Sequence, residues 1–326
     1  MEYILDVLKE YNISPLKIES VTNHLFKVIT ASGSYALKKA QLSKKSTHNW
    51  IHVYHSVNER KSNYILPLYV TRGNNLFLSL KDKIYYLSPW IKQKKDIDFL
   101  KVNRAIRDIH FESLGEQKYK RSLFLDRLAL YKNKIKNLKN QAVKIIEEFE
   151  ESHYMSPVEL QYCTHFHKIM MAFQMIEEEL EGLAKDKLDE TMEGNICLSH
   201  GNYKRDHYLF DGQREYVINW EKSSYTYPII DLISLYNNEL TSNTAHPHTL
   251  IEAFKDYSKK VKLKEFEVSL LNLYMLDPSL YFDALYVKKR EIVKVKELEA
   301  QFRTISFGIK LREFIKEEHN HQSHSK

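Results

Sequence analysis

The sequence predicts an α+β protein with a small, β-rich N-terminal lobe and a large helical C-terminal lobe. Three observations support this prediction. Residues 1–91 contain short runs that alternate apolar and polar side chains, as strands do. From residue 95 onward, apolar side chains recur mainly at helical spacing. The 326 residues include only 8 glycines and 7 prolines, so few sharp turns should interrupt the helices.

The N-terminal lobe, residues 1–91, is predicted to hold an antiparallel sheet plus one helix at Thr47–Glu59, after a short amphipathic helix at Met1–Tyr11. Five runs rich in β-branched and aromatic side chains, bounded by turn residues, are the expected strands. They are Ser20–Thr30, Tyr35–Ala40, Tyr64–Val70, Asn75–Leu80 and Lys83–Leu87.

The C-terminal lobe, residues 92–318, is predicted to be mostly helical. Residues 95–190 show almost unbroken helical spacing, with Pro157 as the main breaker. One hairpin interrupts the helices, because the turn at Asp211-Gly212 separates two short apolar runs. Residues 319–326 contain three histidines and few apolar side chains, so we expect a disordered tail.

Composition excludes several classes of protein. No apolar run approaches the 18 to 20 residues or so of a membrane span. The first residues lack the basic start and apolar stretch of a secretory signal, which favours the cytosol. A net charge of +6 makes the chain mildly basic, without the concentrated basic patch expected of a nucleic-acid binder. Cys163 and Cys197 lack metal or redox spacing and are expected to be reduced thiols. The 22 tyrosines fit either ordinary packing or contacts in an insoluble assembly.

The most informative segment surrounds the predicted hairpin. It reads Ser-His-Gly-Asn-Tyr-Lys-Arg-Asp-His-Tyr-Leu-Phe over residues 199–210 and Val-Ile-Asn-Trp-Glu over residues 217–221. This pair resembles the H-G-D-x-x-x-x-N and D-[FW]-[DE] motifs of the aminoglycoside phosphotransferase and choline kinase superfamily. The resemblance implies a two-lobed, protein-kinase-like (aminoglycoside phosphotransferase-like) fold. In that fold the hairpin places a base near the acceptor hydroxyl and metal ligands near the phosphates.

Other segments match the superfamily in the same order along the chain. Asn23 lies in the equivalent of its first hairpin, and Lys38 lies where the phosphate-binding lysine is expected. Trp90 and Ile91 lie at the expected hinge. The resemblance assigns these four residues to nucleotide binding, if nucleotide binding is retained. Asp231 matches the structural aspartate of a Pro-x-x-Asp-Leu motif.

Within the superfamily the sequence resembles the bacterial spore-coat branch of the CotS and YutH type. The long helical insert between His110 and His200 and the segment Leu276–Phe282 carry this likeness. It implies a protein made in the mother-cell cytoplasm and then bound in the spore coat. The partners would be other coat or morphogenetic proteins, with no nucleic acid and no membrane span.

The sequence departs from the superfamily motif where the chemistry is done. Asn202 replaces the catalytic aspartate, and an amide cannot accept a proton at neutral pH. Asn219 replaces the metal-binding aspartate, and His207 replaces the second metal ligand. Mg²⁺ prefers anionic oxygen ligands, and histidine suits other metals better. We therefore predict a pseudokinase without catalytic residues, bound metal or cofactor.

Two alternatives stay open. Asp206 and Glu221 could replace the missing carboxylates, giving an active small-molecule kinase that uses ATP and Mg²⁺. The protein could instead sense a nucleotide without chemistry. In all three readings His200 is expected to hold the loop backbone rather than act as a base. The helix at residues 47–57 also lacks the glutamate that normally pairs with the lysine; Glu59 lies at its extreme end.

Overall fold

The computed structural model describes residues 2–60, 64–93, 97–185, 190–287 and 290–324. They form two compact units. The first contains residues 1–112 and 198–225, and the second contains residues 113–197 and 226–326. The predicted lobe boundary at residue 91 falls inside the first unit, because the helix at Phe99–Glu112 and the hairpin both group with the N-terminal sheet.

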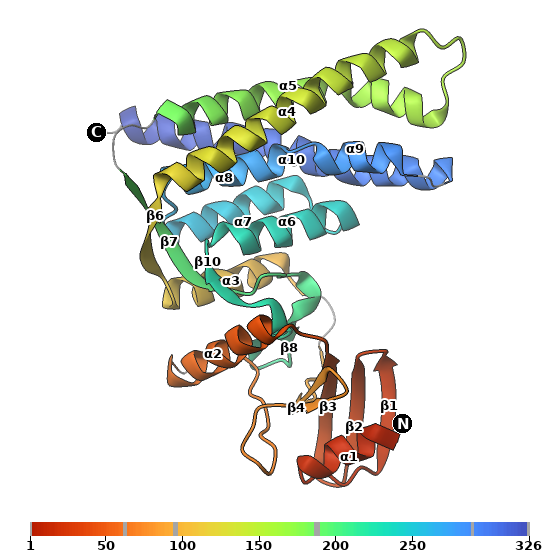
Figure 1. The fold of residues 1–326 in the computed structure, drawn as a ribbon, viewed down its shortest axis with the longest axis vertical. Coiled ribbons are helices and arrows are strands. Elements are labelled where there is room, and N and C mark those ends of the chain that lie inside the picture. The colour runs from red at the N-terminus through yellow and green to blue at the C-terminus, as the bar shows by residue number, and fades with distance from the viewer. Residues whose placement is uncertain (1, 61–63, 94–96, 186–189, 288–289, 325–326) are drawn as a thin grey trace. The chain divides into compact units, whose positions relative to one another are not determined.

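The first unit is built on a five-stranded antiparallel sheet of order β1-β2-β3-β5-β4. Helix α1 lies against this sheet (Figure 1). Its apolar side chains, among them Val7 and Leu8, belong to one buried cluster with Val28, Leu37 and Leu87 of the sheet. The elements of the unit are α1 (Glu2–Glu10), β1 (Lys17–Thr22), β2 (Leu25–Thr30), β3 (Gly33–Ala40), α2 (Lys44–Arg60), β4 (Leu78–Leu80), β5 (Lys83–Pro89), α3 (Phe99–Glu112), β8 (Tyr208–Phe210) and β9 (Glu215–Val217).

Three of the strand predictions need correction. A turn at residues 23–24 divides the predicted strand Ser20–Thr30 into β1 and β2. The predicted strand Tyr64–Val70 makes only isolated bridges at Ile65 and Tyr69, because Pro67 between them has no N–H to donate to a ladder. The predicted strand Asn75–Leu80 shortens to its last three residues, which alone pair with β5.

The second unit consists mainly of long helices. Its elements are β6 (Gly115–Lys120), α4 (Arg121–Glu150), α5 (Pro157–Lys185), β7 (Thr191–Ser199), β10 (Ser224–Thr226), α6 (Ile229–Ser242), α7 (Pro247–Lys260), α8 (Glu265–Leu276), α9 (Ser279–Tyr286) and α10 (Glu291–His324). The last residues of β7 and the first residues of β10 belong to the first unit. Among the described residues, no helix has both the length and the apolar composition of a membrane span.

Two predictions for the helical region also need correction. Residues 115–120 form β6, which pairs antiparallel with β7, where we expected helix. The polar sequence Gly-Glu-Gln-Lys-Tyr-Lys has no β pattern of its own, so pairing with β7 determines its conformation. At the C-terminus, α10 continues to His324, beyond the predicted start of a disordered tail at residue 319. No glycine or proline lies between residues 309 and 324 to end that helix, and residues 325–326 lie outside the described part.

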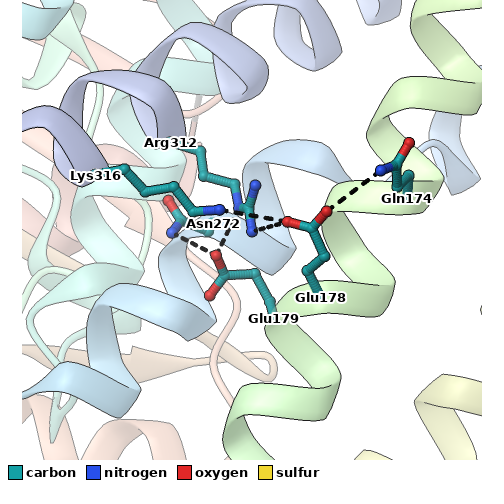
Figure 2. A network of polar contacts seen from close by, with 6 residues as sticks. All are labelled: Gln174, Glu178, Glu179, Asn272, Arg312 and Lys316. Atoms are coloured by element: carbon teal, nitrogen blue, oxygen red, sulfur yellow. Dashed lines mark hydrogen bonds and ion pairs between the residues drawn. The ribbon is translucent and has the colours of Figure 1, made fainter.

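A polar network ties three helices of the second unit together (Figure 2). Arg312 of α10 is almost fully buried and donates to Glu179 over 2.6 Å and to Glu178 over 2.8 Å. Both glutamates belong to α5, and Asn272 of α8 donates to the same Glu179 oxygen over 3.3 Å. Since removing one partner leaves a buried charge uncompensated, the network fixes how α5, α8 and α10 pack.

Helix α10 also approaches the end of α8 very closely at Gly308. A Cβ at residue 308 would lie 2.5 Å from the carbonyl oxygen of Met275, which is backbone and cannot swing away. By contrast, a Cβ on Gly182 of α5 would meet nothing within 4 Å.

The two glycines give a matched pair of variants. We expect Gly308→Ala to lower the free energy of unfolding by about 1–3 kcal/mol, because the methyl group forces α8 and α10 apart. Gly182→Ala should raise it by up to about 1 kcal/mol, because alanine has the higher helix propensity. Urea unfolding followed by circular dichroism measures both. Equal effects of the two substitutions would contradict the close packing at Gly308.

Candidate functional site

The degenerate hairpin forms where it was predicted. β8 and β9 pair antiparallel, and the Asp211 carboxylate accepts hydrogen bonds from the backbone N–H groups of Gln213 and Arg214, both over 2.8 Å. The N–H of Ile218 donates to the carbonyl of His207 over 2.9 Å, so the residues that precede β8 lie beside those that follow β9. This places both parts of the sequence motif in one region of the first unit.

His200 links these two loops. Its Nε2 lies 2.8 Å from the carbonyl oxygen of Ile218, and its Nδ1 accepts from the backbone N–H of Asn202 over 3.3 Å. The imidazole is therefore neutral, with its proton on Nε2. Gly201 has φ +76°, and a Cβ there would lie 2.3 Å from the carbonyl oxygen of Lys222. Only glycine allows this approach without strain.

Aromatic side chains support the same loop. The Tyr203 hydroxyl donates to the carbonyl of Val102 in α3 over 2.9 Å, and the Trp220 indole donates to the carbonyl of Val217 over 2.9 Å. Tyr203 and Trp220 are both buried, and the centroid of the Trp220 ring lies 4.9 Å from that of His200. The backbone of the motif is thus rigidly held even though its carboxylates are absent.

Lys38 makes the central contact of the site. Its ammonium donates to the Glu221 carboxylate over 2.5 Å and also to the side-chain oxygen of Asn219. Tyr86 lies opposite Lys38 in the β3–β5 register and donates its hydroxyl to the same Glu221 oxygen over 2.6 Å. Asn219 has a left-handed backbone, φ 72° and ψ 44°, a conformation that asparagine tolerates well.

The ion pair between Lys38 and Glu221 is largely shielded from water. Their side chains are 21% and 13% exposed, respectively. Burial alone would raise the pKa of Glu221, but the charge of Lys38 and the hydrogen bonds from Lys38 and Tyr86 lower that pKa below its usual value. Burial, reinforced by the Glu221 charge, raises the pKa of the Tyr86 hydroxyl well above 10. Glu221 is therefore ionised and Tyr86 protonated at neutral pH.

Helix α2 packs aromatic side chains beside this pair. Trp50 and Tyr54 are buried, and the ring of Trp50 lies 5.0 Å from that of Tyr86. The same helix packs against the 3₁₀ turn Trp220–Lys222, which carries Glu221. The side chain of Glu59 lies outside the described residues. The lysine that we expected to bind phosphate is thus paired with a carboxylate of the hairpin.

His207 is held as a neutral imidazole. Its ring stacks on that of His200 with centroids 5.1 Å apart. Burial, together with the nearby His200 and Lys38, lowers the pKa of His207 to about 3. Among the described residues, its Nδ1 is buried and has no hydrogen-bond partner.

Of three other residues proposed for the site, two are exposed and one lies in the second unit. Asp206 is exposed in the 3₁₀ turn Arg205–His207, and the described part of the chain shows no hydrogen bond or ion pair of its carboxylate. Asn23 is exposed in the turn between β1 and β2. Asp231 is fully buried in the first turn of α6, in the second unit, where a carboxylate suits the helix dipole.

Two residues, Trp90 and Ile91, were expected at the hinge. Trp90 is half-buried, with the Lys27 ammonium 5.3 Å from its ring centroid, and Ile91 is also half-buried. The sequence argument missed the neighbouring Gln93, whose side chain bonds the backbone of Tyr208 and Phe210 and so anchors β8. It also missed Tyr86, which has no motif of its own; only the pairing register opposite Lys38 identifies it.

The side chains at the site do not fit a magnesium ion. Asn202 and Asn219 offer neutral oxygens, His207 offers a nitrogen, and the Glu221 carboxylate is already bound to Lys38. Among the described residues, no group of three or more His, Cys, Asp and Glu side chains could hold a metal ion.

Comparison with known proteins identifies the fold. A model of the phosphotransferase enzyme family matches residues 159–260, which include the hairpin. An aminoglycoside phosphotransferase from Alicyclobacillus acidocaldarius superposes with a TM-score of 0.72 over 96% of each chain at 10% identity. The structure of spectinomycin phosphotransferase bound to AMP superposes with a TM-score of 0.60 at 14% identity, over 94% of this chain and 98% of that one.

A microcompartment-associated aminopropanol kinase gives a TM-score of 0.55 at 10% identity, over 95% of this chain and 96% of that one. No curated protein sequence matches the chain significantly. At such identities the likeness establishes the fold alone. It confirms the predicted α+β, kinase-like class with a β-rich N-terminal part and a larger helical part; the spore-coat branch stays a prediction.

The Lys38–Glu221 pair makes stability depend on pH. The pKa of Glu221 is lower in the folded protein than in the unfolded chain, where it is about 4.3. The ion pair therefore contributes fully to the free energy of unfolding above the unfolded-state pKa, and this contribution is lost as the pH falls through the folded-state pKa. Between about pH 6 and pH 3, the wild type should therefore lose stability more steeply than Glu221→Gln. At neutral pH, Glu221→Gln should lower the free energy of unfolding by up to about 3 kcal/mol.

A matched control is Glu19→Gln, which removes the charge from the exposed Lys17–Glu19 pair. It should change the pH dependence much less, because exposed pairs contribute little. Urea unfolding at each pH measures all three proteins. Parallel curves for the wild type and Glu221→Gln would show that the buried pair does not contribute.

Proposed function

We propose that this protein is a pseudokinase, a kinase-fold protein that acts by binding partners rather than by transferring phosphate. One observation carries the proposal: the ammonium of Lys38 lies 2.5 Å from the carboxylate of Glu221, while positions 202 and 219 hold amides. The cation that would bind phosphate is already neutralised by a side chain of the same unit.

Chemical reasoning supports the loss of catalysis. Phosphoryl transfer depends on positioning and on neutralising the charge of the phosphates, usually with metal ions. Asn202 cannot accept the acceptor proton, and Asn219 cannot supply an anionic metal ligand. Each such electrostatic contribution is worth several kcal/mol, so losing two should lower the rate by several orders of magnitude.

The geometry disfavours the active-kinase alternative. Asp206 is exposed, and the Glu221 carboxylate already accepts hydrogen bonds from Lys38 and Tyr86, so a metal ion there would share this carboxylate with the Lys38 ammonium. A nucleotide-sensing function faces the same competition, because a polyphosphate would have to displace Glu221 from Lys38. The two alternatives differ in their need for metal: an active kinase requires Mg²⁺, and a nucleotide sensor does not.

We further propose that the protein is a scaffold of the bacterial spore coat, made in the mother-cell cytoplasm and contacting other coat or morphogenetic proteins. Support comes from the resemblance to the CotS and YutH type, including the segment Leu276–Phe282, which joins α8 to α9. Leu276, Tyr281 and Phe282 of this segment are buried in the helical core. The abundance of tyrosine adds less support, because many tyrosines, such as Tyr236 and Tyr257, are fully buried packing residues.

The proposal predicts that nucleotide does not stabilise the protein. We expect thermal unfolding with millimolar ATP to give the same midpoint as without it, both with Mg²⁺ and with a chelator. A ligand present at about 100 times its dissociation constant would stabilise by about 2.7 kcal/mol, which is easily detected. ATP turnover should stay at the level of a blank.

The same measurement separates the alternatives. A midpoint shift that requires Mg²⁺ and disappears in Glu221→Gln would favour an active kinase. A shift that survives the chelator and disappears in Lys38→Met would favour a nucleotide sensor. Either result would overturn the pseudokinase with a closed lysine site.

The spore-coat role has its own test. Deleting the gene in a sporulating host should change the protein composition of the coat or slow germination. Expression of the double variant Lys38→Met/Glu221→Gln, which removes both charges of the pair together, should restore both, because the scaffold does not use the lysine for chemistry. Normal coats and normal germination in the deletion strain would argue against this role while leaving the pseudokinase proposal intact.

A further inference from the structure

The second unit contains a cavity of about 430 Å³ that is separate from the residues of the degenerate hairpin. Side chains of β6, α4, β7, α6 and α8 and of the residues just before α6 line it. Its size lies within the range of about 300–1,000 Å³ typical of small-molecule sites. The pseudokinase proposal assigns no role to this cavity.

Two tyrosines form a preorganised wall of the cavity. The rings of Tyr119, on β6, and Tyr227, just before α6, lie with centroids 4.9 Å apart. A Cβ on Gly194 would lie 3.0 Å from the Tyr119 ring and 3.1 Å from the Tyr227 ring. Glycine at position 194 therefore allows both rings to pack over β7, so this wall is built into the fold.

Apart from two basic side chains, the rest of the lining is apolar or aromatic. It includes the rings of Tyr131 of α4 and Tyr274 of α8, and aliphatic side chains such as Leu270 and Ile230. Tyr274 is exposed, so the cavity opens to solvent at that side chain. Aromatic rings of this kind offer a large apolar contact area with little loss of side-chain entropy.

The charges at the cavity have one sign. Lys120 and Arg127 both line it and are exposed, whereas the lining as the structure describes it contains no aspartate or glutamate. Burial, and after it the charge of Asp277, raises the pKa of the Tyr131 hydroxyl. The Asp277 carboxylate also lies 3.7 Å from the Lys134 ammonium, which offsets its charge. A guanidinium at the edge of an apolar cavity is well suited to hold a carboxylate or sulfonate.

We propose that this cavity binds an amphipathic anion, with an aliphatic or aromatic body against the tyrosines and an acidic group at Arg127 and Lys120. Charge complementarity decides against the opposite ligand: aromatic rings also attract organic cations, but two basic side chains at the same cavity repel them. The inference is independent of whether the hairpin binds nucleotide.

The test uses the full-length protein and the fluorescent probe 8-anilinonaphthalene-1-sulfonate, an aromatic anion. We expect saturable binding of one probe per chain. Arg127→Glu should weaken it by about tenfold or more, because attraction becomes repulsion. Lys136→Glu, the same reversal at an exposed position of α4 outside the lining, should change it less than about twofold. Leu270→Trp, which fills the cavity, should abolish binding.

Two competitors with the same tail identify the preferred charge. Decanoate should displace the probe at a concentration at least about tenfold lower than decyltrimethylammonium does. Circular dichroism checks that each variant is folded, and Arg127→Glu keeps the test valid if Leu270→Trp fails to fold. Absence of saturable binding, equal affinity in Arg127→Glu and Lys136→Glu, or stronger displacement by the cation would each overturn the proposal.

Discussion

The contact between Lys38 and Glu221 is the constraint that organises the first unit. It joins β3 to the turn that follows the hairpin, and Tyr86 adds β5 through the same carboxylate oxygen. Both charges are mostly buried, so neither can lose its partner without an uncompensated charge. The aromatic side chains of α2 pack beside the pair and keep water from screening it.

The loop geometry of the superfamily motif does not require the superfamily chemistry. His200 bridges the two loops through backbone groups, Gly201 permits the close approach to Lys222, and Tyr203 anchors the loop to α3. None of these contacts involves a carboxylate. The amides at positions 202 and 219 are therefore compatible with this backbone framework.

Sequence reasoning succeeded where the signal is local. Asp211-Gly212 specified the hairpin, and the scarcity of glycine and proline gave the long helices α4, α5 and α10. It failed where the conformation or the contacts of a residue depend on partners distant in the sequence. Residues 115–120 become a strand only because β7 lies beside them. Likewise, no sequence pattern reveals that Lys38 pairs with Glu221, which lies 183 residues away along the chain.

Local charge balance at this site supports the proposal that it binds no metal. An aspartate at position 219 would add a second negative charge beside Lys38, an arrangement that needs a further cation to be stable. With asparagine at this position, Lys38 and Glu221 neutralise one another, and the Asn219 amide accepts a hydrogen bond from the same ammonium. The amide at position 219 and the internal ion pair are thus mutually consistent. Asn219 adds no negative charge that would attract a cation, and Glu221 neutralises the lysine that would otherwise attract phosphate.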